Sequence, residues 1–327
     1  MESFDLVCLG ELLIDFVATT PGSLRAAPGF VKAPGGAPAN VAVAASRLGL
    51  KAGFVGKVGD DEFGRFLLDT LRENRVDVMG LRLSSRGATP LAFVSVTENA
   101  ERDFLFYWNR TADHFMSTRD IPARRVRSSR IFHYGSISLI HPATRSATHH
   151  ALNAALSGAR TFVSCDPNLR LDLWPSRAAA KRTVLETIKK VHLVKVNEDE
   201  LQFLTGFSDV IRGIKALSRF TKAAIIVTRG PKGAIFRWHQ EEGEVPGFSV
   251  PAIDGTGAGD GFVAGFLRCL AAVPDDLRKL KPEAPFVSEW VRYANAVGAL
   301  ATMKRGAIPA FPTPDEVKAL LVSDRRS

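Results

Sequence analysis

Short apolar runs alternate with longer amphipathic runs along most of the chain. This alternation is typical of parallel strands that are joined by crossover helices. The apolar runs predict strands at residues 5–10, 52–59, 130–135, 161–166, 192–196 and 223–228. The amphipathic runs predict helices at residues 38–49, 61–74, 178–190 and 198–204, and a further apolar helix follows from about residue 262. We therefore expect an α/β fold in which one domain, residues 1–327, surrounds a mostly parallel sheet.

One stretch departs from this rhythm and alternates as two antiparallel strands would. Residues 91–108 read LAFVSVTENAERDFLFYW, with a polar turn at 98–103. Segments at about 12–20 and 88–110 are together expected to form a small inserted β-sheet lid over a cleft. A plain edge hairpin would explain the same alternation, and the pattern leaves both interpretations open. Residues 283–290, which contain a proline, are interpreted as a loop before a helix.

Polar and acidic residues follow several of the predicted strands. They include Glu11 and Asp15 after the first strand, and the segments 59–61, 166–170 and 197–200 after later ones. In a doubly wound sheet, ligands bind beyond the carboxyl ends of the strands. This edge of the sheet is therefore where we expect the chemistry.

The sequence IDGTGAGDGF at residues 253–262 has glycine at alternate positions and leads directly into the apolar helix. A glycine-rich approach to a helix start is either a turn or a cradle whose unpaired N–H groups and helix dipole bind a phosphate. Asp260 falls in the same turn as Gly257, Ala258 and Gly259. If the loop is a cradle, a general base and an anion hole lie together.

A second glycine cluster, APGGAPAN at residues 33–40, precedes a helix of small residues. Its glycines would permit close approach to a ligand, and Asn40 can both donate to and accept from hydroxyl groups. Taken alone, this cluster favours a simple turn over a sugar site. Neither glycine cluster matches the phosphate loop GxxxxGK[ST] or the dinucleotide motif GxGxxG.

The composition, 46% apolar and 24% charged, is that of a globular protein with a large core. The net charge of +9 favours anionic partners such as nucleotides or sugar phosphates. Basic residues gather at 123–130 without the aromatic residues of a nucleic-acid module, so we interpret this stretch as a solvated connector and expect no nucleic-acid partner.

Three distant cysteines, no signal-like N-terminus and no long apolar run predict a cytoplasmic protein without a membrane partner. The pair His149–His150 lacks further ligands at metal spacing.

Two motifs carry a resemblance to a known family. GGAPANVAVAASRLG near the start and DGTGAGDGFVAG near the end resemble the two signatures of the ribokinase-like (PfkB) carbohydrate kinases. Between and after them, IFHYGSISLI, DPNLRLDLWPS, VNEDELQFLTG and YANAVGALATMKRGAIPAFPT are similar to the plant-type fructokinases. The match runs from about Asp5 to about Val322. It implies a three-layer α/β/α sandwich with a small β-sheet lid, and transfer of the γ-phosphoryl group of ATP to the 6-hydroxyl of fructose.

The resemblance also implies roles for individual residues. Asp260 takes the position of the general base, and Gly257, Ala258 and Gly259 that of the anion hole. The positions implied for the sugar are Asp15, Gly35, Gly36, Asn40, Trp108 and Arg170, with Gly59 and Asp60 at the hinge of the lid. Those implied for the nucleotide are Asn197, Thr228, Gly230, Lys232, Gly233 and Asn295. Glu200 would hold Mg²⁺ through water, and Asp254, Thr256, Ala301, Lys304, Gly306 and Ala310 would hold K⁺. Without the resemblance, NEDEL at 197–201 favours a helix cap with acids in the first turn.

The sequence departs from the fructokinase pattern at the lid and beside the catalytic loop. Trp108 replaces an arginine that faces the sugar, and Arg110 replaces a proline; the tryptophan would either stack on the sugar or pack at the lid edge. Gly255 and Gly261 stand where threonine and alanine are usual. Alternatives are a kinase for another sugar or a sugar acid such as 2-keto-3-deoxygluconate, and a fructokinase-like regulatory protein. A homodimer through the lid is an arrangement that the pattern allows but does not establish.

Overall fold

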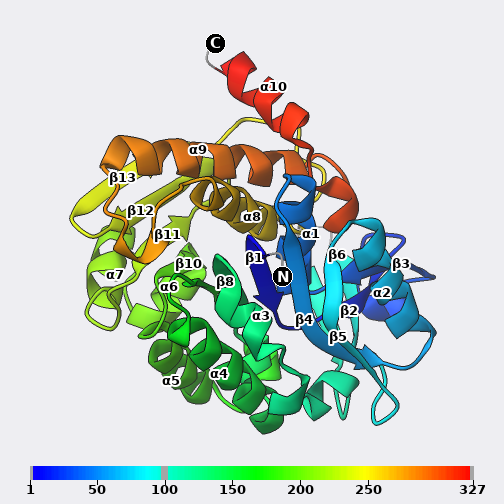
Figure 1. Ribbon diagram of the computed structural model, residues 1–327. Coiled ribbons are helices and arrows are strands. Elements are labelled where there is room, and N and C mark those ends of the chain that lie inside the picture. Colours follow the sequence, from blue (N-terminus) through cyan, green and yellow to red (C-terminus); the bar gives the residue numbers. More distant parts are fainter. Residues whose placement is uncertain (1–2, 97–101, 325–327) are drawn as a thin grey trace.

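The computed structural model describes residues 3–96 and 102–324 (Figure 1). A nine-stranded sheet has the strand order β13-β12-β11-β10-β9-β8-β1-β4-β5. The strands from β11 to β5 in this order are parallel, and β12 and β13 are antiparallel additions at one edge. Their bounds are β1 Leu6–Leu9, β4 Ala52–Gly59, β5 Asp77–Ser84, β8 Ile131–Gly135, β9 Phe162–Asp166, β10 Leu193–Asn197, β11 Ala224–Thr228, β12 Ala234–Trp238 and β13 Glu241–Val245.

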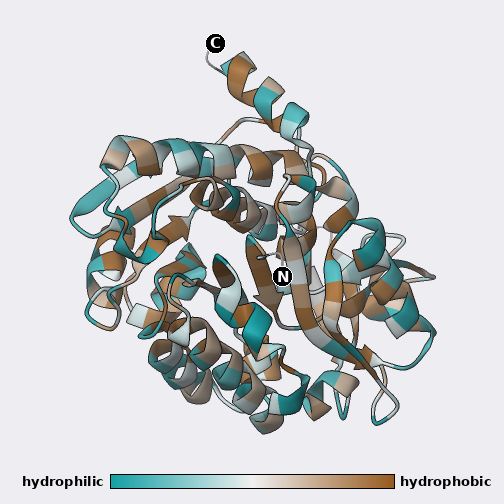
Figure 2. Ribbon diagram, viewed as in Figure 1, coloured by the Kyte–Doolittle hydropathy of each residue, from teal (hydrophilic) through white to brown (hydrophobic). Residues whose placement is uncertain are grey.

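Helices cover both faces of this sheet, which confirms the predicted three-layer sandwich. One core cluster joins the sheet to α1, α2, α8 and α9, and a second joins it to α3 to α7. Figure 2 shows apolar residues along the central strands, while the helices also carry hydrophilic residues. The helix bounds are α1 Ala37–Arg47, α2 Glu62–Glu73, α3 Ala123–Ser128, α4 Pro142–Ser157, α5 Arg177–Ile188, α6 Glu198–Thr205, α7 Val210–Leu217, α8 Ala258–Ala271, α9 Ala284–Ala301 and α10 Pro314–Asp324. Short 3-10 helices are η1 Leu24–Ala26, η2 Ala112–Phe115, η3 Thr118–Asp120, η4 Ile137–Leu139, η5 Leu171–Leu173, η6 Gly230–Lys232, η7 Leu277–Lys279 and η8 Ile308–Ala310.

A second sheet of four strands, the lid sheet, stands beside the main sheet. Its strands are β2 Leu13–Ala18, β3 Phe30–Gly35, β6 Leu91–Val96 and β7 Arg102–Tyr107, in the order β3-β2-β6-β7. The hairpin predicted from residues 91–108 is therefore β6 and β7, and most of its predicted turn at 98–103 lies outside the described residues. Strand β3 was not predicted, because Pro34 and two glycines favoured a turn there.

Aromatic packing connects the lid sheet to the main body. Phe16 of β2 stacks on Phe93 of β6 with ring centroids 5.0 Å apart, and its edge meets Phe63 of α2 at 5.7 Å. At the start of β6, the backbone N–H of Thr89 donates to Asp61, which also caps α2 by accepting from the N–H of Gly64. The same carboxylate therefore fixes both a helix start and the entry into the lid sheet.

The predicted loop at residues 283–290 was wrong, because α9 begins at Ala284. Pro285 lies in the first turn of this helix, where the missing N–H has no intrahelical partner to lose. Trp290, two turns into the helix, packs against Trp238 of β12 at 5.8 Å and Phe266 of α8 at 6.1 Å. The basic stretch at 123–130 forms α3, whose Arg125 pairs with Asp77 at 3.1 Å. Across the described ranges, none of the helices combines the length and apolarity needed to span a lipid bilayer.

Gly261 offers a test of how tightly α8 is packed. A Cβ at this position would lie 3.5 Å from Ala301 and from Val297, which is ordinary van der Waals contact. Alanine has the higher helix propensity, so we expect Gly261→Ala to raise the free energy of unfolding by about 0.5–1 kcal/mol in urea denaturation. Gly265→Ala is the matched control, because its Cβ would lie 2.9 Å from Val297 and 3.1 Å from the backbone of Ala294. That variant should lose stability; a loss in both variants would contradict the packing described.

Candidate active site

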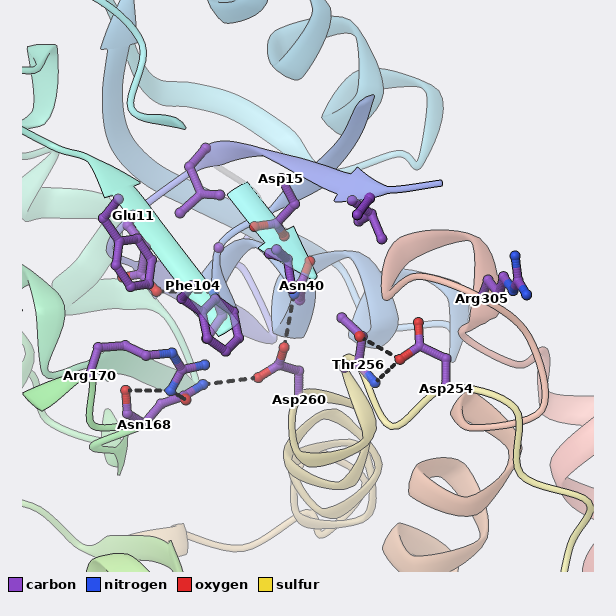
Figure 3. A pocket seen from close by; sticks show the side chains of 18 of the residues that line it. Glu11, Asp15, Asn40, Phe104, Asn168, Arg170, Asp254, Thr256, Asp260 and Arg305 are labelled. Atoms are coloured by element: carbon purple, nitrogen blue, oxygen red, sulfur yellow. Dashed lines mark hydrogen bonds between the residues drawn. The ribbon is translucent and has the colours of Figure 1, made fainter. Parts of the chain in front are cut away.

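A cavity of about 340 Å³ lies between the lid sheet and the ends of the central strands (Figure 3). Its walls come from β2 and β7 of the lid sheet, the start of α1, the loop after β9 and the loop that leads into α8. Asp15, Asn40, Arg170 and Asp260 all line it, although they come from four distant parts of the chain. The carboxyl ends of the strands are thus the place where the predicted residues converge.

Asp260 lies in the first turn of α8 and is 7% exposed. Its Oδ2 accepts a hydrogen bond from Asn40 Nδ2 at 2.9 Å, and Asn168 Nδ2 approaches Oδ1 at 3.5 Å. Burial raises the pKa of Asp260 to about 7, against the lowering effect of the Asn40 hydrogen bond. A carboxylate that titrates near neutral pH is well suited to take a proton from a hydroxyl group.

The start of α8 lies at the same cavity, which Gly257 and Asp260 line. Gly257 is the N-cap residue in a left-handed conformation with φ 79°, and within the described chain no side chain caps this turn. A Cβ on Gly257 would lie 2.7 Å from that of Ala307, so the loop can pack here only as glycine. A helix start of this kind favours an anion through its N–H groups and the helix dipole, although the N–H of Ala258 also donates to the backbone oxygen of Gly255 at 3.3 Å. The anion-hole role of Gly257, Ala258 and Gly259 stays a prediction.

Lys195 was missed by the sequence analysis, although it lies close to this anion loop. It interrupts the apolar strand β10, is 7% exposed, and places Nζ 3.0 Å from Asp166 Oδ2. The same Nζ lies 3.2 Å from the point where a Cβ of Gly259 would be. Burial alone would lower the pKa of Lys195, but the charges of Asp166 and Glu200 raise it above its usual range. A charged residue inside an apolar strand was the signal that could have identified it.

Glu11, which the sequence placed among the polar residues after the first strand without a specific role, also lines the cavity. Its Oε1 accepts from the N–H of Ala37 at 3.0 Å and so supports the start of α1, while Oε2 has no partner among the described residues. Burial raises the pKa of Glu11 to about 7. The residue therefore helps to position α1, from which Asn40 reaches Asp260.

Several residues implied for the sugar lie near Asn40 and Asp260 in this cavity. A Cβ on Gly35 would lie 2.1 Å from Asp15 Oδ2, so glycine in β3 is required for the carboxylate to lie across the strand. Gly36, with φ 109°, is the N-cap residue of α1. Arg170 donates to Asn168 Oδ1 at 2.6 Å, and its guanidinium lies 6.0 Å from the Phe104 ring of the lid sheet. These residues bring a polar floor and an aromatic wall to one cavity.

The two departures at the lid differ in their placement. Trp108 lines the cavity and is 9% exposed, whereas Arg110 is exposed, has φ 55° and is not among the lining residues. Trp108 Nε1 donates to Asp113 Oδ2 at 2.7 Å. Trp108 is therefore packed into the lid edge and also forms part of the pocket wall.

Most of the residues implied for the nucleotide lie outside the cavity, near the ends of β10 and β11, whereas Asn295 lies on α9. Asn197 and Thr228 are register partners in these strands, and Gly230 and Lys232 lie in η6, directly before Gly233. Asn295 of α9 is buried and donates to the backbone oxygens of Val245 and Pro246 at 3.2 and 3.0 Å. The observed contacts of Asn295 connect α9 to the end of β13.

The geometry around Glu200 is that of a capping box. The N–H of Glu200 donates to Asn197 Oδ1 at 2.8 Å, and the N–H of Asn197 donates to Glu200 Oε2 at 3.0 Å. Oε1 accepts from the N–H of Leu169 at 2.7 Å. Both oxygens of Glu200 therefore accept backbone hydrogen bonds. In the part of the chain that the structure describes, no group of three or more His, Cys, Asp or Glu side chains is arranged to hold a metal ion.

Asp254 connects the glycine loop to the segment after α9. Its Oδ1 accepts from the N–H and the hydroxyl of Thr256 at 2.9 and 2.6 Å, and Oδ2 accepts from the N–H of Gly306 at 2.9 Å. Ala301 ends α9 and Ala310 ends η8, while exposed Lys304 approaches Glu316 at 3.5 Å. The structure thus brings Asp254, Thr256 and Gly306 into direct contact.

Comparisons with known proteins agree with this geometry. The family model of the pfkB family carbohydrate kinases matches residues 3–314. A probable fructokinase-4 of Arabidopsis thaliana is 47% identical over 319 residues, covering 97% of this chain and 96% of its own. A crystal structure of a Xylella fastidiosa fructokinase with bound ATP has a TM-score of 0.88 and 34% identity, with 98% of each chain covered. A fructokinase from Vibrio cholerae O395, in a form with bound fructose, ADP and calcium ion, has a TM-score of 0.86 and 35% identity, covering 97% of this chain and 98% of that one.

The resemblance predicted from the two glycine motifs is thereby confirmed. The family model covers both motifs, and the fold and the cavity place them face to face through Asn40 and Asp260. The chain belongs to the pfkB family of carbohydrate kinases.

Proposed function

We propose that this carbohydrate kinase transfers the γ-phosphoryl group of ATP to the 6-hydroxyl of fructose. The observation that carries the proposal is the position of Asp260: a buried carboxylate lies beside the N–H groups that begin α8, in a cavity with Asp15 and Asn40. A general base and an anion site so close together suit phosphoryl transfer to a hydroxyl group.

In the proposed reaction, Asp260 takes the proton of the 6-hydroxyl as its oxygen attacks the γ-phosphorus. The bond between that phosphorus and the bridging oxygen breaks, and ADP leaves with the electron pair. The N–H groups of Gly257, Ala258 and Gly259 stabilise the negative charge on the transferred group. Lys195 lies beneath this loop and adds a positive charge at the same place.

Fructose is the substrate best supported by the relatives and by the polar floor of the cavity. The similar plant protein is named a probable fructokinase, and one similar structure contains fructose together with ADP. In our proposal Asp15 and Asn40 bind sugar hydroxyls, the backbone at Gly35 and Gly36 approaches the sugar, and Arg170 and Trp108 complete the pocket. On the nucleotide side the proposed contacts are Asn197, Thr228, Gly230, Lys232, Gly233 and Asn295.

Two cations complete the proposal. Asp166, Glu200 and Asp260 are three buried carboxyl groups with one buried lysine, Lys195, so a divalent cation would balance their charge. Since both oxygens of Glu200 accept backbone hydrogen bonds, we expect it to hold Mg²⁺ through water, where the ion would neutralise the phosphates. The loop joined by Asp254, Thr256 and Gly306 would hold K⁺ with the backbone at Ala301, Lys304 and Ala310, and so order the anion site.

The arrangement beyond one chain is also a proposal. On the face of the lid sheet that points away from the cavity, Leu105 and Tyr107 of β7 are 48% and 58% exposed. Apolar exposure on this scale supports a homodimer through the lid, which light scattering on the purified protein would test. A single domain with a closing lid, and a cytoplasmic location, stay predictions.

The direct test is ADP release measured with fructose, glucose, ribose and 2-keto-3-deoxygluconate as acceptors. We expect fructose to have the highest kcat/KM. Asp260→Asn should lower kcat for fructose by about 10²- to 10⁴-fold, because the proton of the attacking hydroxyl loses its acceptor. Turnover by the variant at the wild-type rate would refute the role of Asp260. No turnover with any sugar would favour a regulatory protein instead.

The raised pKa of Asp260 also predicts how stability depends on pH. The unfolded carboxyl ionises near its usual value of 3.8, whereas the folded one holds its proton to about pH 7. This group therefore stabilises the folded state fully below pH 4, and the contribution is lost as the pH rises to 7. Asparagine cannot ionise, so the stability of Asp260→Asn relative to wild type should rise across this range, by on the order of 1–4 kcal/mol. The control Asp69→Asn removes an exposed carboxylate and should show no such rise; a flat difference for Asp260→Asn would contradict the assignment.

A further inference from the structure

The wall of the cavity that belongs to the lid sheet is aromatic. Phe104 and Phe106 alternate along β7 and Trp108 follows two residues later, so all three side chains lie on the same face and line the cavity. Phe104 and Phe106 stack with centroids 5.7 Å apart, and Phe106 and Trp108 are 6.0 Å apart. Figure 3 shows Phe104 extending toward the polar floor that holds Asn168, Arg170 and Asp260.

Trp108 is held in a fixed orientation by Asp113. The indole N–H donates to Asp113 Oδ2 at 2.7 Å, and the hydroxyl of Thr111 donates to Oδ1 at 2.6 Å. The backbone oxygen of Asp113 accepts from the hydroxyl of Thr144 on α4 at 2.7 Å. Because Trp108 and Asp113 are only 9% and 8% exposed, this network is largely shielded from water. The indole has a single donor, and that donor is used.

The wall therefore offers a ligand apolar contact and no hydrogen-bond donor from Trp108. The side chains of Trp108, Leu13 and Ala92 form one apolar cluster against which Ile137 and Leu173 pack. The C–H groups of a sugar can pack against such a surface. A carboxylate placed there would lose water without gaining a donor, which is costly.

The lining also has few basic side chains that could pair with a carboxylate. The acids that line the cavity are Glu11, Asp15, Asp254 and Asp260, and the bases are Arg170 and Arg305. One edge of the Arg170 guanidinium already donates to Asn168 and to the backbone oxygen of Leu169. The lining thus has more acids than bases, although the chain as a whole has a net charge of +9.

We propose that Trp108, held by Asp113, is a specificity-determining residue that selects an uncharged sugar and excludes sugar acids. The proposal rests on the proposed function, since it assumes that the sugar occupies this cavity. The resembling fructokinases have arginine at this position, so a Trp108→Arg variant tests whether the selection in this chain depends on the aromatic wall.

The test compares Trp108→Arg with Trp108→Phe. Arginine can donate to Asp113 and still present donors to a ligand, whereas phenylalanine keeps an apolar wall. The ratio of kcat/KM for fructose to that for 2-keto-3-deoxygluconate should fall at least about tenfold in Trp108→Arg. In Trp108→Phe the ratio should stay within about threefold of wild type, even if both rates fall. An unchanged ratio in Trp108→Arg would show that Trp108 only packs the lid edge.

Thermal unfolding would show whether each variant folds. If a variant does not fold, a measurement on the wild-type protein still tests the proposal. Calorimetric titration compares 2-keto-3-deoxygluconate with its methyl ester, which has the same shape near the sugar but no charge. The ester should bind at least about tenfold more tightly, whereas equal or tighter binding of the acid would overturn the proposal. Because this readout needs no turnover, a failure to phosphorylate fructose would sink the proposed function alone.

Discussion

The hydrogen bond from Asn40 to Asp260 joins two residues that are 220 positions apart, over a distance of 2.9 Å. It brings together the first turns of α1 and α8. Each of these helices follows a glycine with a positive φ angle, Gly36 before α1 and Gly257 before α8. The two helices pack side by side on one face of the main sheet, so their N-terminal ends open toward the same cavity. The lid sheet, the proposed sugar pocket and the proposed anion site are all arranged around this contact.

This arrangement requires several acids to be buried together. Asp166, Glu200 and Asp260 are each less than a tenth exposed, and Lys195 is the buried cation among them. Burial raises the pKa of Glu11 and Asp260 toward neutrality, which costs stability in the free protein. The same burial gives Asp260 the basicity that a proton acceptor needs. If Asp260 is the proposed base, the burial that makes it reactive also lowers the stability of the free protein, as is common at catalytic sites.

Much of the fold could be predicted because the central strands are short apolar runs and their helices are amphipathic. Elements were mispredicted where local sequence signals favoured a different conformation from the one that tertiary contacts impose. Strand β3 contains Pro34 and ends at Gly35, so it resembled a turn, yet pairing with β2 makes it a strand. Pro285 suggested a loop, although a proline is tolerated in the first turn of α9. Strand β13 has too few apolar positions for its sequence to predict a strand, so the antiparallel pair β12 and β13 was not predicted.

The glycine motifs pointed to Asp260 and Asn40, because unusual spacing before a helix is visible in a sequence. Lys195 was not predicted, because a single charge within an apolar strand does not show which residue compensates it. Glu11 was placed among the polar residues after the first strand, but its contact with the start of α1 could not be predicted. Trp108 was left between two interpretations, and only the contact with Asp113 showed that the ring both packs and lines the cavity.

If Asp260 acts as a base whose ionisation is set by its burial, the pH dependence of kcat/KM for fructose should follow that ionisation. We expect kcat/KM to fall about tenfold per pH unit below an ionisation near pH 7, and the residual activity of Asp260→Asn to lack this ionisation. A wild-type profile that stays level down to pH 5, or the same ionisation in Asp260→Asn, would rule out this role for Asp260.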